Sequence, residues 1–143
     1  MTRTQSAASA DTSVLVAAFA TWHESHDVAR RALRRVTGVV AHAAWETYSV
    51  LTRLPDPHRV AGDVVTAWLA TLPATWLALS GDDLRRALTD AERRGISGGA
   101  IYDALILATA TGHEQVLLTL DLRALATYRR MDGAVEMLSG GTS

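Results

Sequence analysis

Four carboxylates, each isolated inside a long uncharged stretch, constrain this chain more than any other feature of its sequence. They are Asp11, Glu46, Asp103 and Asp121. The surrounding runs are apolar enough to be carried toward a core, where a carboxylate without a partner is costly. Four such residues indicate a shared solution, and the simplest is a cluster neutralised by hard divalent cations, which bind Asp and Glu oxygens.

Length and composition narrow the possible chemistry. The chain has 143 residues, which fits a single domain over residues 1–143, with residues 1–6 and 140–143 expected to be flexible. It has no Cys, so disulfides, zinc–thiolate sites and Cys nucleophiles are excluded. All 14 basic residues are Arg, and the lack of Lys excludes P-loops and Schiff bases. The net charge of −1 gives no overall attraction to nucleic acid, so a polyanion would have to bind at local patches.

No apolar stretch approaches the roughly 18 residues that span a bilayer. The apolar run at 14–20 is short for a signal peptide, and Arg3 is the only positively charged residue before it. Export is therefore not expected, and we predict a cytoplasmic protein.

Short apolar runs predict strands, and the longer mixed segments between them predict helices. The strand candidates are 39–43, 75–79, 116–120 and 134–138, with 6–10 as a weak candidate. Helical patterns cover 23–36, 44–54, 58–72 and 81–95. Ser97 is a plausible N-cap for a further helix that carries Asp103. Strands that alternate with helices predict an α/β fold, namely a three-layer α/β/α domain with a central parallel sheet.

The predicted fold lets the four acids converge. In open α/β sheets, ligands bind beyond the carboxyl ends of the strands. Asp11 and Asp121 directly follow strand candidates, Glu46 lies in the first turns of the helix after 39–43, and Asp103 lies about one turn into the helix that follows Gly98 and Gly99. Two carboxylates about 5 Å apart repel each other by roughly 3 kcal/mol at an effective dielectric constant near 20.

Mg²⁺ or Mn²⁺ bound at such a cluster would hold a phosphodiester, activate a water molecule and stabilise the leaving oxygen. The sequence therefore favours metal-dependent phosphodiester hydrolysis. A structural network of ion pairs is the alternative that the residues alone leave open.

Four segments in order and in register resemble the PIN-domain proteins, and in particular the VapC toxins of type II (VapBC) toxin–antitoxin pairs. The segments are ADTSVLVAAF, HAAWETYSVLTRLP, GISGGAIYDALILATA and LLTLDLRA. The resemblance implies a PIN fold and an Mg²⁺- or Mn²⁺-dependent endoribonuclease that acts as a toxin. It implies RNA as substrate, a homodimer and a VapB-type antitoxin as partner. The catalytic and metal-binding residues would be Asp11, Glu46, Asp103 and Asp121. The small, polar segment before Asp11 departs from the usual apolar first strand.

Hydroxyl groups beside the acids are candidates to bond a carboxylate or a metal-bound water. They are Thr12, Ser13 and Thr119, with Thr119 favoured over Ser13. Local capping of the backbone is the alternative for each.

Arg53 lies seven residues after Glu46 and hence on the same helical face. We interpret Arg30, Arg31, Arg34 and Arg35 as a solvated helix face or a site for RNA phosphates. The four Trp residues are expected in the core or in a dimer interface.

Two other functions deserve weight. Another metal-dependent phosphohydrolase, such as a haloacid-dehalogenase-like phosphatase, needs a DxD nucleophile motif, but Asp11 is followed by Thr12 and Ser13. A catalytically silent PIN-fold binding module is the non-enzymatic alternative. A binding module would gain nothing from four mutually repelling acids, so an enzyme is favoured.

Overall fold

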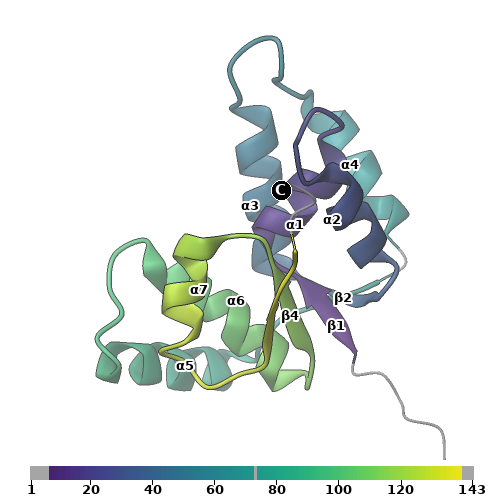
Figure 1. Ribbon diagram of the computed structural model, residues 1–143. Helices are drawn as coiled ribbons and strands as arrows, with labels where there is room; N and C mark the ends of the chain where they lie inside the picture. The colour runs from purple at the N-terminus through teal and green to yellow at the C-terminus, as the bar shows by residue number, and fades with distance from the viewer. Residues whose placement is uncertain (1–6, 73, 140–143) are drawn as a thin grey trace, which may run out of the picture.

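The computed structural model describes residues 7–72 and 74–139, so the predictions for residues 1–6 and 140–143 lie outside the described residues. Its centre is a five-stranded sheet in the order β3-β2-β1-β4-β5, and every pair of neighbouring strands is parallel (Figure 1). The strands are β1 (Ala8–Ala10), β2 (Val36–Val40), β3 (Thr75–Leu77), β4 (Val116–Thr119) and β5 (Val135–Met137). The prediction of a three-layer α/β/α domain with a parallel sheet is confirmed.

Helices connect the strands and cover both faces of the sheet. They are α1 (Thr12–Phe19), α2 (His26–Leu33), α3 (Ala41–Thr52), α4 (Gly62–Thr71), α5 (Gly81–Arg93), α6 (Ala100–Gly112) and α7 (Leu122–Tyr128). The helices α1 to α4 gather on one side of the sheet and α5 to α7 on the other (Figure 1). This division follows from right-handed crossovers, because the chain moves outward from β1 to β3 and then returns to β4 and β5.

The first strand is made of small residues because it lies at the centre of the sheet. Ala8, Ser9 and Ala10 have no exposed surface and pair with both β2 and β4. Segment 6–10 is only a weak strand candidate because Ala and Ser have low strand propensity. It contains β1 nevertheless, because burial between two helical layers outweighs this low propensity. Around it the core is formed by aliphatic side chains such as Leu15, Leu51, Ile106 and Leu117.

Several element boundaries differ from the sequence predictions. The strand expected at 39–43 ends at Val40, and the next three residues already belong to α3. The helix expected over 23–36 is limited to α2, since Val36 begins β2. Ser97 does not cap α6: the N-cap is Gly99, which has no side chain to bond the helix. Gly98 precedes it at φ 62°, a left-handed conformation that favours glycine.

The tryptophans were expected in the core or in a dimer interface, and one of the four packs against the core. Trp45 is 74% exposed, and Trp22 and Trp76 are each 49% exposed, so these three do not pack in the core. Trp68 does pack, edge-on against Phe19 with the ring centres 5.4 Å apart. In the part of the chain that the structure describes, no helix is long and apolar enough to cross a membrane.

Candidate active site

The four isolated acids line one cleft at the carboxyl edge of the sheet. Asp11 follows β1, and Asp121 comes two residues after the last residue of β4. These strands are neighbours, but α1 leaves toward one face of the sheet and α7 toward the other (Figure 1). The crevice at such a divergence is the expected ligand site of a parallel sheet. A cleft of about 1200 Å³ opens there, and Asp11, Glu46, Asp103 and Asp121 all line it.

Asp11 is the buried member of the cluster. It is the N-cap of α1, and its Oδ1 accepts hydrogen bonds from the Val14 backbone N–H at 3.2 Å and from the Ser13 hydroxyl at 2.5 Å. Its Oδ2 accepts a hydrogen bond from the Tyr128 hydroxyl at 2.8 Å. Burial raises the pKa of Asp11, and the hydroxyls of Ser13, Thr119 and Tyr128 oppose this rise. The carboxylate is thus oriented by groups from three parts of the chain.

Of the predicted hydroxyl groups, Ser13 joins the ends of β1 and β4, whereas Thr119 bonds the backbone locally after β4. Besides donating to Asp11, Ser13 Oγ accepts the Leu120 backbone N–H at 2.9 Å. Thr119 Oγ1 accepts the Asp121 backbone N–H at 3.0 Å. The structure therefore gives Ser13 the more direct contact with an acid, in contrast to the preference for Thr119. Thr12 Oγ1 is buried and has no hydrogen-bond partner among the described residues.

Asp121 combines exposure with a capping role. Its side chain is exposed, and Oδ1 accepts the backbone N–H groups of Arg123 at 2.9 Å and Ala124 at 3.2 Å. It is thus the N-cap of α7, as Asp11 is of α1. The remaining carboxylate oxygen is not engaged by the cap and is available to a ligand in the cleft.

Asp103 shows that the acids act on one another. Its pKa is raised from 3.8 to about 6, first by burial and then by the negative charges of Asp121, Glu46 and Asp11, while Arg123 lowers it. Glu46 Oε1 is buried and lies 3.0 Å from Nε2 of His42, yet neither atom has a hydrogen-bond partner in the described chain. Since His42 is the only group in ion-pair contact with any of the four acids in the described chain, the cluster keeps the negative charge and the oxygen lone pairs that a cation needs.

The donor set fits a hard divalent ion. All four candidate ligands offer carboxylate oxygens, which Mg²⁺ and Mn²⁺ prefer. Within residues 7–72 and 74–139, no three Asp, Glu or His side chains are already gathered around a single point. The cluster is therefore an acidic cleft rather than a closed cage. This openness suits Mg²⁺, which usually keeps several waters and takes only one or two carboxylates together with substrate phosphates.

Three further residues of the cleft were not assigned to the site by the sequence. Tyr128 is separated from Asp11 by 117 positions, although its place seven residues after Asp121 puts it on the same helical face. Arg123 and Tyr102 also line the cleft. Arg53, which helical periodicity placed on the face of Glu46, does line the cleft. Arg30, Arg31 and Arg34 instead line a separate surface depression on α2.

Comparison with known proteins agrees with the fold and with the position of the cleft. The model of the PIN domain family matches residues 10–131. Ribonuclease VapC40 of Mycobacterium tuberculosis is 51% identical over 130 residues, which cover 90% of this chain and 97% of that protein. The chain therefore belongs to the PIN-domain family, among its VapC ribonucleases.

Two solved structures share the fold at lower identity. The M. tuberculosis toxin VapC20, described as cleaving the sarcin–ricin loop, superposes with a TM-score of 0.66 at 20% identity, covering 84% of this chain and 94% of that one. A chain of the Rickettsia felis VapBC2 complex, bound to a promoter DNA fragment, superposes with a TM-score of 0.63 at 15% identity, covering 92% and 98%. At these identities the likeness shows the shared fold alone.

Proposed function

We propose that this protein is an Mg²⁺- or Mn²⁺-dependent endoribonuclease that acts as the toxin of a toxin–antitoxin pair. The observation that carries the proposal is the convergence of Asp11, Glu46, Asp103 and Asp121 in one cleft. The family of the chain and the ribonuclease name of its 51%-identical relative support the nature of the reaction. A silent binding module is disfavoured, because the mutual repulsion of the acids would serve no purpose there.

The protein groups divide the work of the site. Asp11 is held in place by Ser13 and Tyr128, so its charge has a fixed position beneath the cleft. Glu46, Asp103 and Asp121 are more open and approach the same space from α3, α6 and the start of α7. A bound Mg²⁺ or Mn²⁺ would supply the Lewis acidity that activates water and stabilises the leaving oxygen.

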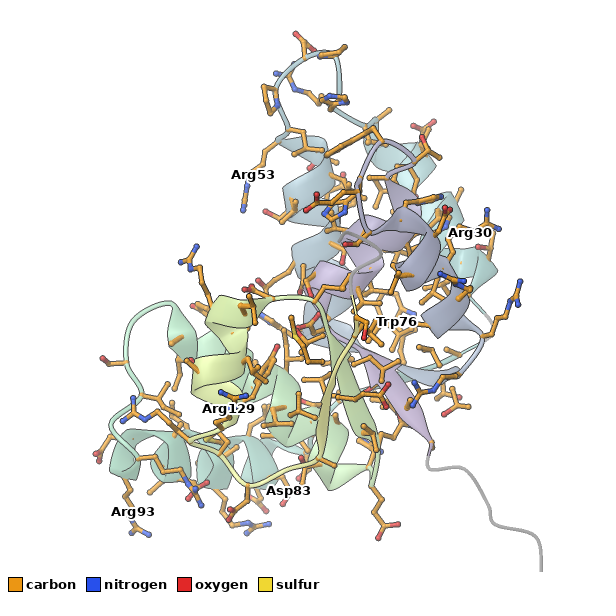
Figure 2. All side chains as sticks on the ribbon, in the orientation of Figure 1. Arg30, Arg53, Trp76, Asp83, Arg93 and Arg129 are labelled. Carbon is orange, nitrogen blue, oxygen red and sulfur yellow. The ribbon has the colours of Figure 1, made fainter. Side chains whose placement is uncertain are left out.

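Two arginines provide contacts for the polyanion. Arg53 and Arg123 line the cleft, and no ion pair joins either of them to another described residue. Figure 2 shows Arg53 extending from the end of α3 toward the side where α7 lies, whereas Arg30 points outward from α2 on the other side of the view. Positive charge beside the acids suits the phosphates that flank a cleaved bond, since guanidinium groups bind phosphate well.

Partners follow from the family and from the surface. We propose a VapB-type antitoxin, in keeping with the VapBC2 complex of the same fold, and a homodimer. The helix α5 carries Leu84 and Leu88, which are 41% and 59% exposed. They border an apolar depression completed by Ile101, Ala104 and Leu105 of α6. Apolar surface of this kind is typical of an interface between copies of a chain.

Substitution of Asp103 by Asn tests the site. The change keeps the shape of the side chain and removes one charge, so we expect a folded protein whose RNA cleavage falls by orders of magnitude. Cleavage of RNA in Mg²⁺ and the melting temperature should be measured on the same preparation. If Asp103 were half of a structural ion pair, its loss would destabilise the protein by roughly 3–5 kcal/mol. A destabilised variant that still cuts RNA would contradict the proposed site.

A further inference from the structure

An aromatic pair stands beside the acids at the junction of α3 and α6. The rings of His42 and Tyr102 are stacked, with their centres 5.1 Å apart and their planes only 8° from parallel. His42 comes from the first turn of α3, which carries Glu46, and Tyr102 directly precedes Asp103 on α6. The pair is therefore fixed to the two helices that bring two of the four acids into the cleft.

The two rings have different surroundings. Tyr102 is 52% exposed and lines the cleft, whereas His42 is not among the residues that line it. His42 therefore covers one face of the phenol ring, and about half of the Tyr102 residue remains exposed beside the cleft. The other aromatic residues with large exposed surfaces are placed differently, because none of them lines this cleft: Trp22, Trp45, Tyr48 and Trp76. Tyr128 does line it, but is itself buried and hydrogen-bonded to Asp11.

An exposed ring with one face supported has the form of a stacking platform. A nucleobase gains free energy by stacking on an aromatic side chain, and the gain is largest when the ring does not have to be ordered first. His42 restrains Tyr102 before any ligand arrives. Arg53 and Arg123 in the same cleft would hold the phosphates while the ring holds a base. An unstacked base of single-stranded RNA fits this combination, because the bases of a duplex are not free to stack on a protein.

We propose that Tyr102, supported by His42, stacks on the nucleobase next to the phosphodiester that is cleaved. The inference rests on the proposed ribonuclease function and specifies its substrate as RNA that is single-stranded at the cut. Because every base has an aromatic face, the platform selects for an accessible base rather than for one base identity.

The experiment uses an RNA that the wild-type protein cleaves, identified beforehand by mapping the ends of the cleaved RNA. An oligoribonucleotide with that sequence is bound to the full chain carrying Asp103→Asn, in Mg²⁺, so that it stays intact. Adding Tyr102→Ala should weaken binding of the RNA about 5- to 150-fold, the range expected for loss of one stacked base. Tyr102→Phe should restore it. Trp45→Ala, which removes a more exposed ring of the α3 surface outside the cleft, should leave affinity unchanged.

An abasic residue distinguishes stacking from a structural role. When the base beside the cut is removed from the RNA, the proteins with and without Tyr102→Ala should bind equally. Equal affinity of these two proteins for the intact RNA would overturn the platform while leaving the ribonuclease function standing. The platform would also be overturned, in favour of a protein interface at Tyr102, if Tyr102→Ala halved the mass of the protein in light scattering and left its affinity for RNA unchanged. If the wild-type protein cuts no RNA, the proposed function fails first, and the platform fails with it.

Discussion

At the scale of single residues, the pKa of Asp103 is raised in part by the negative charge of the other acids in the cleft. Its pKa of about 6 lies above the ordinary value of 3.8 because of burial and three neighbouring carboxylates. A carboxyl group whose pKa is raised by folding binds its proton more tightly in the folded state than in the unfolded state. Its ionisation therefore destabilises the folded protein as the pH rises through about 6.

We expect the metal-free protein to become more stable as the pH is lowered from 7.5 toward 5. Because the side chain is partly exposed, solvent screening limits the contribution of Asp103 to about 1 kcal/mol, or roughly 4 °C in melting temperature. Thermal melts in EDTA across this pH range measure the effect. The Asp103→Asn variant should show a flatter profile and a higher melting temperature near pH 7.5. A profile identical to that of the wild-type protein would show that Asp103 does not experience the charges of the other acids.

The contacts of individual residues mark the limit of what the sequence could predict. The isolation of four acids was visible in the chain, and all four do line one cleft. The bond from Tyr128 to Asp11 joins residues 117 positions apart, and no local pattern encodes such a contact. The bond from the Ser13 hydroxyl to Asp11 is local in sequence, whereas the bond that the same hydroxyl accepts from Leu120 exists only because β1 and β4 are neighbours.

At the scale of elements, two of the acids also begin helices. Asp11 caps α1 and Asp121 caps α7, so each is needed by the backbone as well as by the proposed chemistry. Asp103 and Glu46 lie within helices and have no capping role. Removal of a capping acid should therefore destabilise the protein and reduce its activity together, while removal of the Asp103 charge should reduce activity without destabilising the fold.

Substitutions at Asp121 separate the two roles. Asp121→Ala removes the bonds to Arg123 and Ala124 and should lower the free energy of unfolding by about 1 kcal/mol. Asp121→Asn retains a capping oxygen and should unfold close to wild type, since Asn caps helices as well as Asp does. Both variants should lose RNA cleavage. Urea unfolding measures the stability of both variants, and a cleavage assay measures their activity on RNA. If Asp121→Asn still cleaved RNA, the role of Asp121 would be helix capping alone.

The elements themselves were predicted unevenly. Alternation of strands and helices was sufficient for the fold class. The helix α1 was not predicted, because its residues, such as Val14, Leu15 and Val16, are apolar nearly all the way round and show no helical stripe. The junction of β2 and α3 was misplaced because Val40 and Ala41 follow each other with no turn residue or side-chain cap between them.

At the scale of the whole molecule, the cleft joins the two layers of helices. Glu46 comes from α3, and Asp103 comes from α6, which lies on the other side of the sheet (Figure 1). Asp11 and Asp121 line the same cleft from the ends of β1 and β4. A cation in this cleft would neutralise charges that the two layers bring together. Binding to the folded form alone would then stabilise the entire domain.

Millimolar Mg²⁺ or Mn²⁺ should raise the melting temperature relative to EDTA. At a free metal concentration about 100 times the dissociation constant, the gain would be about 2.7 kcal/mol. The double variant Glu46→Gln/Asp103→Asn is the control, because it keeps the fold and halves the number of acids, and its melting temperature should respond much less. An unchanged melting temperature of the wild-type protein across this range of metal would count against a shared cation site.

The strand order also has a consequence for synthesis of the protein on the ribosome. The central strands β1 and β4 pair residue Ala8 with Val116, so the middle of the sheet is completed by segments made early and late. Until residue 121 has emerged and β4 has inserted beside β1, a nascent chain holds at most three of the four acids and lacks the part of the cleft wall formed by residues 120–128. We therefore expect the proposed site to stay incomplete, and RNA cleavage by the nascent chain to be absent, until translation has passed the segment that contains α6 and β4.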